Sequence, residues 1–337
     1  MAPRSGEPLS LPCAARGSGG LPVSSPARLR LEKAGYYLSN YLSLLGRGTP
    51  RDLAARARDR AASAGLEARI AYCLGRPAEW DCAALADWPT LADLRGAKRN
   101  VYFFDLHRYT RDYPPDLHAH WRFGDITECQ PVPTLVKSRP IGECAASVLF
   151  RLNTIRHFRF VDDPLSWEQK KDLLVWRGGA YRENRQRLLR EWFDHPQCDI
   201  GHVAKERSSG DYDKPFLSIP QQLACKFVLS LEGNDVATNL KWILSSNSLC
   251  VMPPPRFETW FMEGRLQPGV HYAEIRADFS DLGAVIDHYL RHPEEARAIV
   301  RNGHAWVRQF TDPQREALLS YRVLDEYFVR TGQFAAV

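Results

Sequence analysis

No stretch of about 18 consecutive apolar residues occurs in this 337-residue sequence, which argues against a membrane-spanning helix. The first residues include Arg4, Glu7 and Arg16, where a secretory signal would need an uninterrupted apolar core. The eight cysteines form no C-x-x-C pair and have no histidine at zinc-binding spacing. We therefore predict a cytoplasmic protein whose thiols are reduced and mostly buried, with neither a disulfide framework nor a metal site.

Charge of one sign is not in large excess either. The 45 basic and 40 acidic residues leave a net charge of +5, which is small for a dedicated nucleic-acid binder. An anionic ligand or an anionic membrane surface remains compatible with it. No G-x-G-x-x-G motif follows an apolar run, which argues against a nicotinamide-dependent oxidoreductase. With 44% hydrophobic residues, the chain can form two domains of ordinary size.

The segment 226–264 predicts a βαβα unit of a doubly wound sheet. The apolar run Phe227 to Leu231 ends in Glu-Gly-Asn-Asp, and apolar residues at helical spacing follow at 236–243. A second apolar run, Leu249 to Met252, leads into three prolines and an aromatic-rich segment, read as a helix, with Glu258 near its start. Ligands of such sheets lie beyond the carboxyl ends of the strands, where these polar residues gather. We expect a nucleotide or another phosphorylated molecule there.

Several spaced blocks in this region resemble glycosyltransferase family 90. They are LEGNDVATNLKW at 231–242, SSNSL at 245–249, ETWFMEG at 258–264 and HY at 271–272. The bacterial lipopolysaccharide branch is the most similar, and weaker blocks (FFDLHRYTRDYP, FGDIT and VKSRPIG) extend the resemblance back to about Val101. The resemblance implies an α/β fold with two Rossmann-like domains facing a cleft, the GT-B type. It also implies a metal-independent enzyme that uses a nucleotide sugar.

The chain is divided accordingly. Residues 1–28 are rich in Gly, Pro, Ser and Ala and predict a flexible leader. Residues 29–165 are expected to form an acceptor-side α/β domain, with a strand at 100–105. Residues 166–310 are expected to form the nucleotide-sugar domain. In residues 311–337 a last helix is expected to pack back on the first domain.

Two helices are expected near the beginning, at 29–45 and 51–71. The first has a basic start and carries Tyr36, Tyr37 and Tyr41. These tyrosines could lie at a membrane interface, but docking of the helix on its own domain is the favoured interpretation.

Positive charge for a donor diphosphate is expected from several positions. Arg177 ends a predicted strand at 173–179, where a planar guanidinium can bind two phosphate oxygens. The family resemblance assigns the diphosphate to Arg177 and matches a second arginine to Arg185. Lys241 adds charge, whereas Asn239 stands where the animal branch of the family has an arginine.

The sugar and the nucleoside are expected to contact the central block. Gly233 permits close backbone approach, and Asn234 and Asp235 either face the ligand or cap the next helix. Glu258 matches a position that holds ribose hydroxyls, although a glutamate in a first helical turn needs no ligand to explain it. The motif Asp211-Tyr212-Asp213 lies in a Ser/Gly-rich loop, so it is not predicted to bind metal.

A transferase also needs a base for the acceptor hydroxyl. The resemblance implies an aspartate at the end of an N-terminal strand, for which Asp105 is predicted and Asp112 is the alternative. The block containing Lys137, Ser138 and Arg139 is assigned to the acceptor side.

The sequence thus predicts a glycosyltransferase that moves a hexose or pentose from a nucleotide sugar, expected to be a UDP-sugar, to a hydroxyl of a lipopolysaccharide core or similar glycan. Direct displacement with inversion is expected, at the inner face of the cytoplasmic membrane. The alternatives are a non-catalytic glycan-binding or scaffold protein of the same fold, which Asn239 favours, and a protein O-glycosyltransferase. The donor sugar, the acceptor, the linkage and the oligomeric state remain open.

Overall fold

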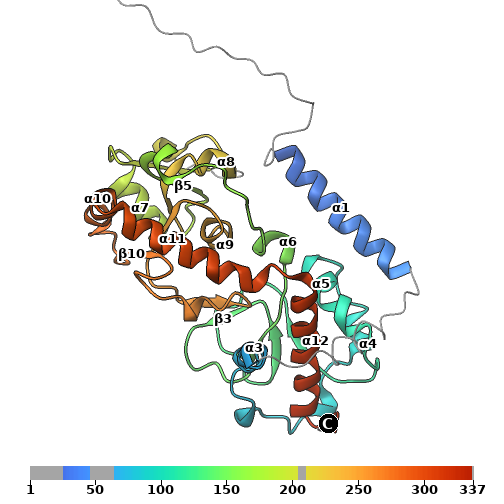
Figure 1. The fold of residues 1–337 in the computed structure, drawn as a ribbon. Coiled ribbons are helices and arrows are strands. Elements are labelled where there is room, and N and C mark those ends of the chain that lie inside the picture. The colour runs from blue at the N-terminus through green and yellow to red at the C-terminus, as the bar shows by residue number, and fades with distance from the viewer. Residues whose placement is uncertain (1–25, 46–63, 204–209, 336–337) are drawn as a thin grey trace, which may run out of the picture.

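The computed structural model describes residues 26–45, 64–203 and 210–335, and Figure 1 shows their arrangement. Most of the predicted leader and much of the predicted helix 51–71 lie outside these residues. The described part is an α/β protein with parallel sheets of the kind found in Rossmann-like folds. The predicted α/β class is therefore confirmed.

The first sheet has three parallel strands in the order β1-β2-β4. These are β1 (His120–Arg122), β2 (Thr134–Val136) and β4 (Ser147–Leu149). Every residue of β2 and β4 is buried, as expected for a parallel sheet covered on both faces. The helices α3 (Ala64–Leu74) and α5 (Val101–Thr110) belong to this part of the molecule.

The second sheet has five parallel strands in the order β10-β8-β7-β5-β6. They are β5 (Lys171–Gly178), β6 (Cys198–His202), β7 (Cys225–Leu229), β8 (Leu249–Met252) and β10 (Ala273–Glu274). The helices around it are α7 (Glu183–Trp192), α9 (Leu240–Leu244), α10 (Leu282–Arg291) and α11 (Pro293–Val307). The predicted runs at 173–179 and 249–252 thus form β5 and β8.

A two-stranded antiparallel ribbon joins the two parts. Its strands are β3 (Ser138–Pro140), which directly follows β2, and β9 (Phe257–Thr259), which follows β8. The aromatic-rich segment after the prolines was predicted to begin a helix, and this prediction is wrong. The backbone of β9 pairs with β3 instead, with Arg139 opposite Glu258.

The last long helix, α12 (Pro313–Arg330), packs on α3 and α5 (Figure 1). Asp312 caps its start by accepting hydrogen bonds from the backbone N–H groups of Gln314 and Arg315. The Tyr327 hydroxyl donates to the carbonyl of Pro133, beside the first sheet, at 2.8 Å. The last helix of the described residues therefore packs against the part of the molecule that contains the first sheet.

The remaining elements are short, apart from α1. They are α1 (Pro26–Leu45), α4 (Leu91–Leu94), α6 (Thr154–His157), α8 (Ile219–Gln222), and single 3-10 turns at Pro77–Glu79, Leu85–Asp87, Trp167–Gln169, Gly210–Tyr212, Glu263–Arg265 and Arg308–Phe310. Among the described helices, none combines the length and the apolar character that crossing a bilayer requires.

The strand predicted at 100–105 is wrong, because this segment begins helix α5. The Asn100 side chain accepts a hydrogen bond from the N–H of Phe103 and so caps the helix at its first turn. Phe103, Phe104 and Leu106 are buried in the core, and this packing outweighs the preference of Val, Tyr and Phe for strands.

The cysteine prediction also needs one correction. Cys129 and Cys144 form a disulfide that closes the segment carrying β2 and β3. The other cysteines of the described residues are free thiols, as predicted: Cys73, Cys82, Cys198, Cys225 and Cys250.

Candidate active site

A pocket of about 590 Å³ lies at the carboxyl ends of the second sheet's strands. Most of its lining residues lie in the segments that follow β5, β7, β8 and β10. Thr127 joins them from the loop after β1 of the first sheet. Its lining includes Arg182, Asn184, Ser230, Glu232, Gly233, Asn234, Val236, Leu240, Met252, Arg256, Phe257, Glu263 and Ala277. Two of the predicted ligand-binding residues, Gly233 and Asn234, thus lie in its wall.

Arg185 supports the loop after β7 through hydrogen bonds to the backbone. The Arg185 guanidinium donates to the backbone carbonyls of Gly179, Leu231 and Glu232, at 2.7 to 3.1 Å. A Cβ atom on residue 233 would lie 3.1 Å from this guanidinium, which explains why Gly233 fits here. Burial, with a smaller contribution from the charge of Arg156, lowers the pKa of Arg185 to about 10. Arg185 therefore supports the pocket wall and is not part of its lining.

Two other arginines present their charge to the pocket. Arg182 is exposed, and its Nε atom donates to the Asn234 side-chain oxygen at 2.9 Å. Arg256, with 65% of its side chain exposed, forms an ion pair with Glu232 at 2.9 Å. Sequence reasoning selected neither Arg182 nor Arg256 as a site residue. The signal for both was their position just beyond a strand end.

Asp125 is the carboxylate that the first sheet brings against the wall of this pocket; its side chain is 30% exposed and touches the lining at Asn234 without being part of it. It follows β1, and its Oδ2 accepts from the Asn234 amide at 3.0 Å, while its Oδ1 lies 2.5 Å from Lys137 Nζ. Burial alone would raise the pKa of Asp125, but the hydrogen bond and charge of Lys137, together with Asn234, hold it below its ordinary range. Asp125 is thus ionised at neutral pH. Sequence reasoning quoted its FGDIT block without choosing the aspartate.

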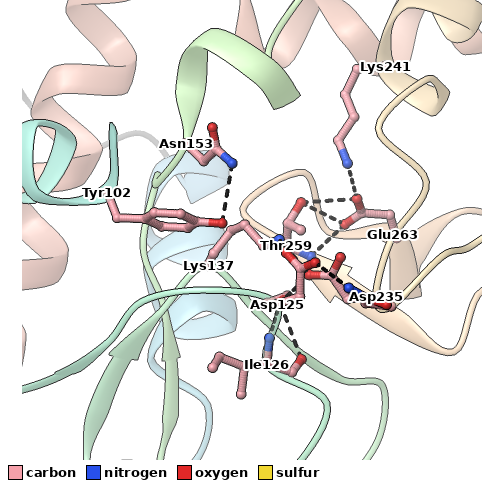
Figure 2. Close-up of polar contacts among 11 residues, drawn as sticks. Tyr102, Asp125, Ile126, Lys137, Asn153, Asp235, Lys241, Thr259 and Glu263 are labelled. Atoms are coloured by element: carbon pink, nitrogen blue, oxygen red, sulfur yellow. Dashed lines mark hydrogen bonds and ion pairs between the residues drawn. The ribbon is translucent and has the colours of Figure 1, made fainter. Parts of the chain in front are cut away.

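Lys137 connects Asp125 to the loop of the second sheet (Figure 2). Its Nζ lies 2.7 Å from Asp235 Oδ2, and the same oxygen accepts from the Ser138 hydroxyl at 2.6 Å. Lys137, Ser138 and Asp235 are all buried, so Asp235 does not point into the pocket. Lys137 and Ser138 were predicted for the acceptor side, and Asp235 for the donor side. Their contacts hold the two parts of the molecule together.

Sequence comparison identifies the family of this chain. The model for glycosyl transferase family 90 matches residues 153–328. The O-glucosyltransferase LpsA of Dichelobacter nodosus is 44% identical over 241 residues, which cover 71% of this chain and 76% of that protein. The chain belongs to glycosyl transferase family 90. The predicted membership and the predicted enzyme class are therefore confirmed: this family 90 protein is a glycosyltransferase.

More distant members of the family are animal proteins. Human protein O-glucosyltransferase 3 is 26% identical over 173 residues, 49% of this chain and 33% of that protein. Protein O-glucosyltransferase 2 of Danio rerio is 27% identical over 158 residues, 42% of this chain and 29% of that protein. The chain spans about a third of these two animal relatives.

Besides Arg185, the three other residues predicted to bind the diphosphate do not line the pocket of this glycosyltransferase. The Arg177 guanidinium lies at the end of β5, as expected, but it donates to the side chain and the carbonyl of Asp199 on β6, at 2.8 and 2.7 Å. Lys241 is fully buried in an ion pair with Glu263 (Figure 2). The Asn239 amide donates to the carbonyl of Leu229 at 2.9 Å and so fixes the end of β7.

Glu258, predicted to hold ribose, is buried in the ribbon of the family 90 enzyme. It accepts a hydrogen bond from Arg139 Nε at 2.8 Å and another from the Tyr72 hydroxyl. Arg139 also donates to the carbonyls of Tyr72 and Ser147, both at 2.8 Å. The contacts of this pair tie α3, the first sheet and β9 together, and neither side chain is in the pocket lining.

The two aspartates predicted as the base are also outside the pocket lining. Asp105 lies within α5, 3% exposed, and accepts from the Thr154 N–H at 2.8 Å and the Tyr36 hydroxyl at 2.7 Å. Burial raises its pKa despite these hydrogen bonds. Asp112 accepts from the Tyr321 hydroxyl of α12 at 2.6 Å. Both carboxylates thus join structural elements.

Side chains suited to hold a metal come close together at one place in the described residues, formed by His292, Glu294 and Glu295 between α10 and α11. None of these residues lines the pocket.

Proposed function

We propose that this glycosyltransferase moves glucose from a UDP-sugar to a hydroxyl of a lipopolysaccharide core or similar glycan. Glucose is chosen within the broader hexose or pentose class because a relative 44% identical is an O-glucosyltransferase. The two parallel sheets act as the two domains of a GT-B arrangement, with the donor bound at the strand ends of the second. The observation that carries the proposal is Asp125 of the first part touching the pocket wall at Asn234.

The pocket offers a suitable surface for each part of such a donor. Val236, Leu240 and Met252 give it apolar lining for a base and a ribose. Arg182 and Arg256 place two guanidinium groups beside it, and these can neutralise the charge that develops on a leaving diphosphate. This chemistry needs no metal ion, because the cations come from the protein.

Asp125 acts as the general base in this mechanism. Its ionised carboxylate takes the proton of the acceptor hydroxyl while the hydroxyl oxygen forms a bond to the anomeric carbon of the donor. The bond from that carbon to the diphosphate oxygen breaks in the same displacement, so the configuration inverts. UDP leaves with the bonding electrons, and the proton on Asp125 passes to solvent. No covalent intermediate with the protein is formed.

Ligand-dependent thermal stability tests the donor site. A ligand that binds only the folded state raises its melting temperature, so UDP and UDP-glucose should stabilise the wild type. Arg182→Ala should lose most of this shift. Arg187→Ala is the matched control and should keep it, because Arg187 lies on α7, just after Arg182, and pairs with Glu191 in solvent.

A transfer assay then tests the activity, with UDP release measured in the presence of a core oligosaccharide that lacks its glucose. If uridine diphosphate compounds do not shift the melting temperature and no transfer is detected, the proposed function is wrong. The non-catalytic alternative then takes its place. That alternative drew on Asn239 replacing an arginine. In the structure Asn239 binds the backbone of β7, so the pocket's positive charge does not depend on this position.

A further inference from the structure

Helix α1 has two apolar faces, and only one of them is covered by the protein. On the inner face, the rings of Tyr36, Tyr37 and Tyr41 contact Phe104 of α5, with centroids 5.0 to 6.4 Å apart. The Tyr36 hydroxyl also donates to Asp105. The favoured interpretation, docking of these tyrosines on the protein itself, is what the structure shows. The helix is thereby fixed with its other face outward (Figure 1).

The outer face carries a row of leucines in solvent. Leu31, Leu38 and Leu42 are spaced by seven and four residues, which places them on one side of a helix. Their exposed fractions are 63%, 62% and 57%. Ala34 and Gly35 lie between them and are exposed as well, and a Cβ atom on Gly35 would meet nothing within 4 Å. The row is therefore unobstructed by the described residues.

Positive charge accompanies this row of leucines. Arg30 is exposed on α1 and lies one residue before Leu31, about 100° around the helix and so at the flank of the row. Exposed Arg99, before α5, has its guanidinium carbon 5.9 Å from the ring centre of Tyr41, near the other end of the helix. The acidic residue Glu32 forms an ion pair with Arg159 at 3.3 Å. An apolar row with cations at both ends is the pattern of a helix that lies on an anionic bilayer.

We propose that the outer face of α1, formed by Leu31, Leu38 and Leu42 with Arg30 and Arg99 beside it, docks on an anionic membrane surface. The leucines enter the region between head groups and acyl chains, and the cations bind the lipid phosphates. A second copy of the chain fits less well. Parallel pairing of two α1 helices through this face would place Arg30 near its copy, and antiparallel pairing would place it near Arg99, so like charges meet in both cases.

Co-sedimentation of the full chain with vesicles tests the proposal. Wild type should bind vesicles of phosphatidylcholine mixed with phosphatidylglycerol, bind pure phosphatidylcholine more weakly, and dissociate as salt is added. The variant Leu31→Ser/Leu38→Ser/Leu42→Ser should bind at least about tenfold more weakly, because it loses most of the apolar area that enters the bilayer. Its melting temperature should not change, since these side chains are exposed. Arg30→Gln/Arg99→Gln should lose the preference for the anionic vesicles.

The matched control is Phe216→Ser, which removes an exposed apolar side chain (49% exposed) from a different part of the molecule and should leave binding unchanged. The proposal is overturned if wild type stays in solution with anionic vesicles, or if the leucine variant binds them as well as wild type. It is also overturned if wild type is a dimer that the leucine substitutions dissociate while vesicle binding is absent, since the face would then join two copies. None of these measurements depends on the donor or on transfer activity.

Discussion

The side-chain amide of Asn234 donates a hydrogen bond of 3.0 Å to the carboxylate of Asp125, across more than one hundred residues of sequence. Asn234 belongs to the loop after β7, and Asp125 to the loop after β1. A residue of the pocket wall is therefore in contact with a carboxylate carried by the other sheet. This contact gives the proposed mechanism its base, and the first prediction follows from it.

Asp125→Asn should lower kcat by about 10²- to 10⁴-fold, since an amide cannot accept the proton of the acceptor hydroxyl. The melting-temperature shift caused by UDP should persist, because the pocket cations are unchanged. Asp105→Asn is the comparison variant. Asp105 is buried and bonded to Tyr36 and Thr154, neither of which lines the pocket, so this change should affect stability and leave most of kcat. The opposite pattern, with kcat lost in Asp105→Asn and kept in Asp125→Asn, would return the base to Asp105.

Lys137 acts as a positioning residue for Asp125, and its removal should change the pH dependence of the reaction. Lys137 holds the pKa of Asp125 low, so wild-type kcat/KM should persist as pH falls. Without that charge the pKa of Asp125 rises, and the acid limb of Lys137→Met should move upward by about one pH unit or more. An unchanged limb would show that Lys137 has only a structural role.

Lys137→Met also leaves the Asp235 carboxylate buried without its cation, which should cost about 3 kcal/mol of stability or more. The double variant Lys137→Met/Asp235→Asn removes that buried charge as well. It should recover stability in denaturant unfolding while keeping the shifted acid limb, so the two effects of Lys137 can be separated.

Glu258→Gln should destabilise the fold by about 3 kcal/mol or more, because it breaks a buried ion pair with Arg139. The donor KM should not change. Glu191→Gln, which breaks an exposed pair within α7, is the control and should cost no more than about 0.5 kcal/mol. A raised donor KM with unchanged stability would instead support the ribose role that sequence reasoning gave to Glu258.

Reducing the disulfide between Cys129 and Cys144 should lower stability. The two cysteines are 15 residues apart, and closing a loop of about this length stabilises a fold by about 3 kcal/mol in the chain-entropy account. Dithiothreitol should therefore lower the melting temperature of wild type. Cys129→Ser should show a similar loss and no further response to the reductant, whereas equal stability of reduced and oxidised wild type would contradict the expectation.

The strand that sequence reasoning placed with its correct bounds is one whose residues are all apolar. Leu249 to Met252 are four buried apolar residues in succession, which is the pattern of a strand inside a parallel sheet, and β8 has these bounds. Residues 100–105 show why the same reasoning failed elsewhere. Their aromatic and β-branched side chains favour a strand, but Asn100 supplies a helix cap, and this signal was available in the sequence.

The individual site residues were harder to predict because each depends on a partner far along the chain. Arg177 does lie at a strand end, yet its guanidinium binds Asp199 on the neighbouring strand. Nothing in the spacing of residues 173–179 reveals that carboxylate. For the same reason the sequence could not show that Asp235 would form an ion pair with Lys137. Nor could it show that Arg182 would line the pocket. The position of the pocket followed from the topology, whereas its charged side chains depended on pairings that only the folded chain determines.

The return of α12 to the first part has a consequence for the synthesis of the chain. The core that surrounds the first sheet includes Leu66 and Phe103, but also Leu319, Leu324 and Phe328. A ribosome produces the former long before the latter, so the emerging N-terminal part cannot complete its core until almost the whole chain has been made. The other face of the second sheet packs in a separate core whose buried residues all lie between Trp167 and Ile299, so that core has no such delay. The nascent chain should therefore acquire protease resistance first in its C-terminal half, in the reverse of the order in which the two halves are translated.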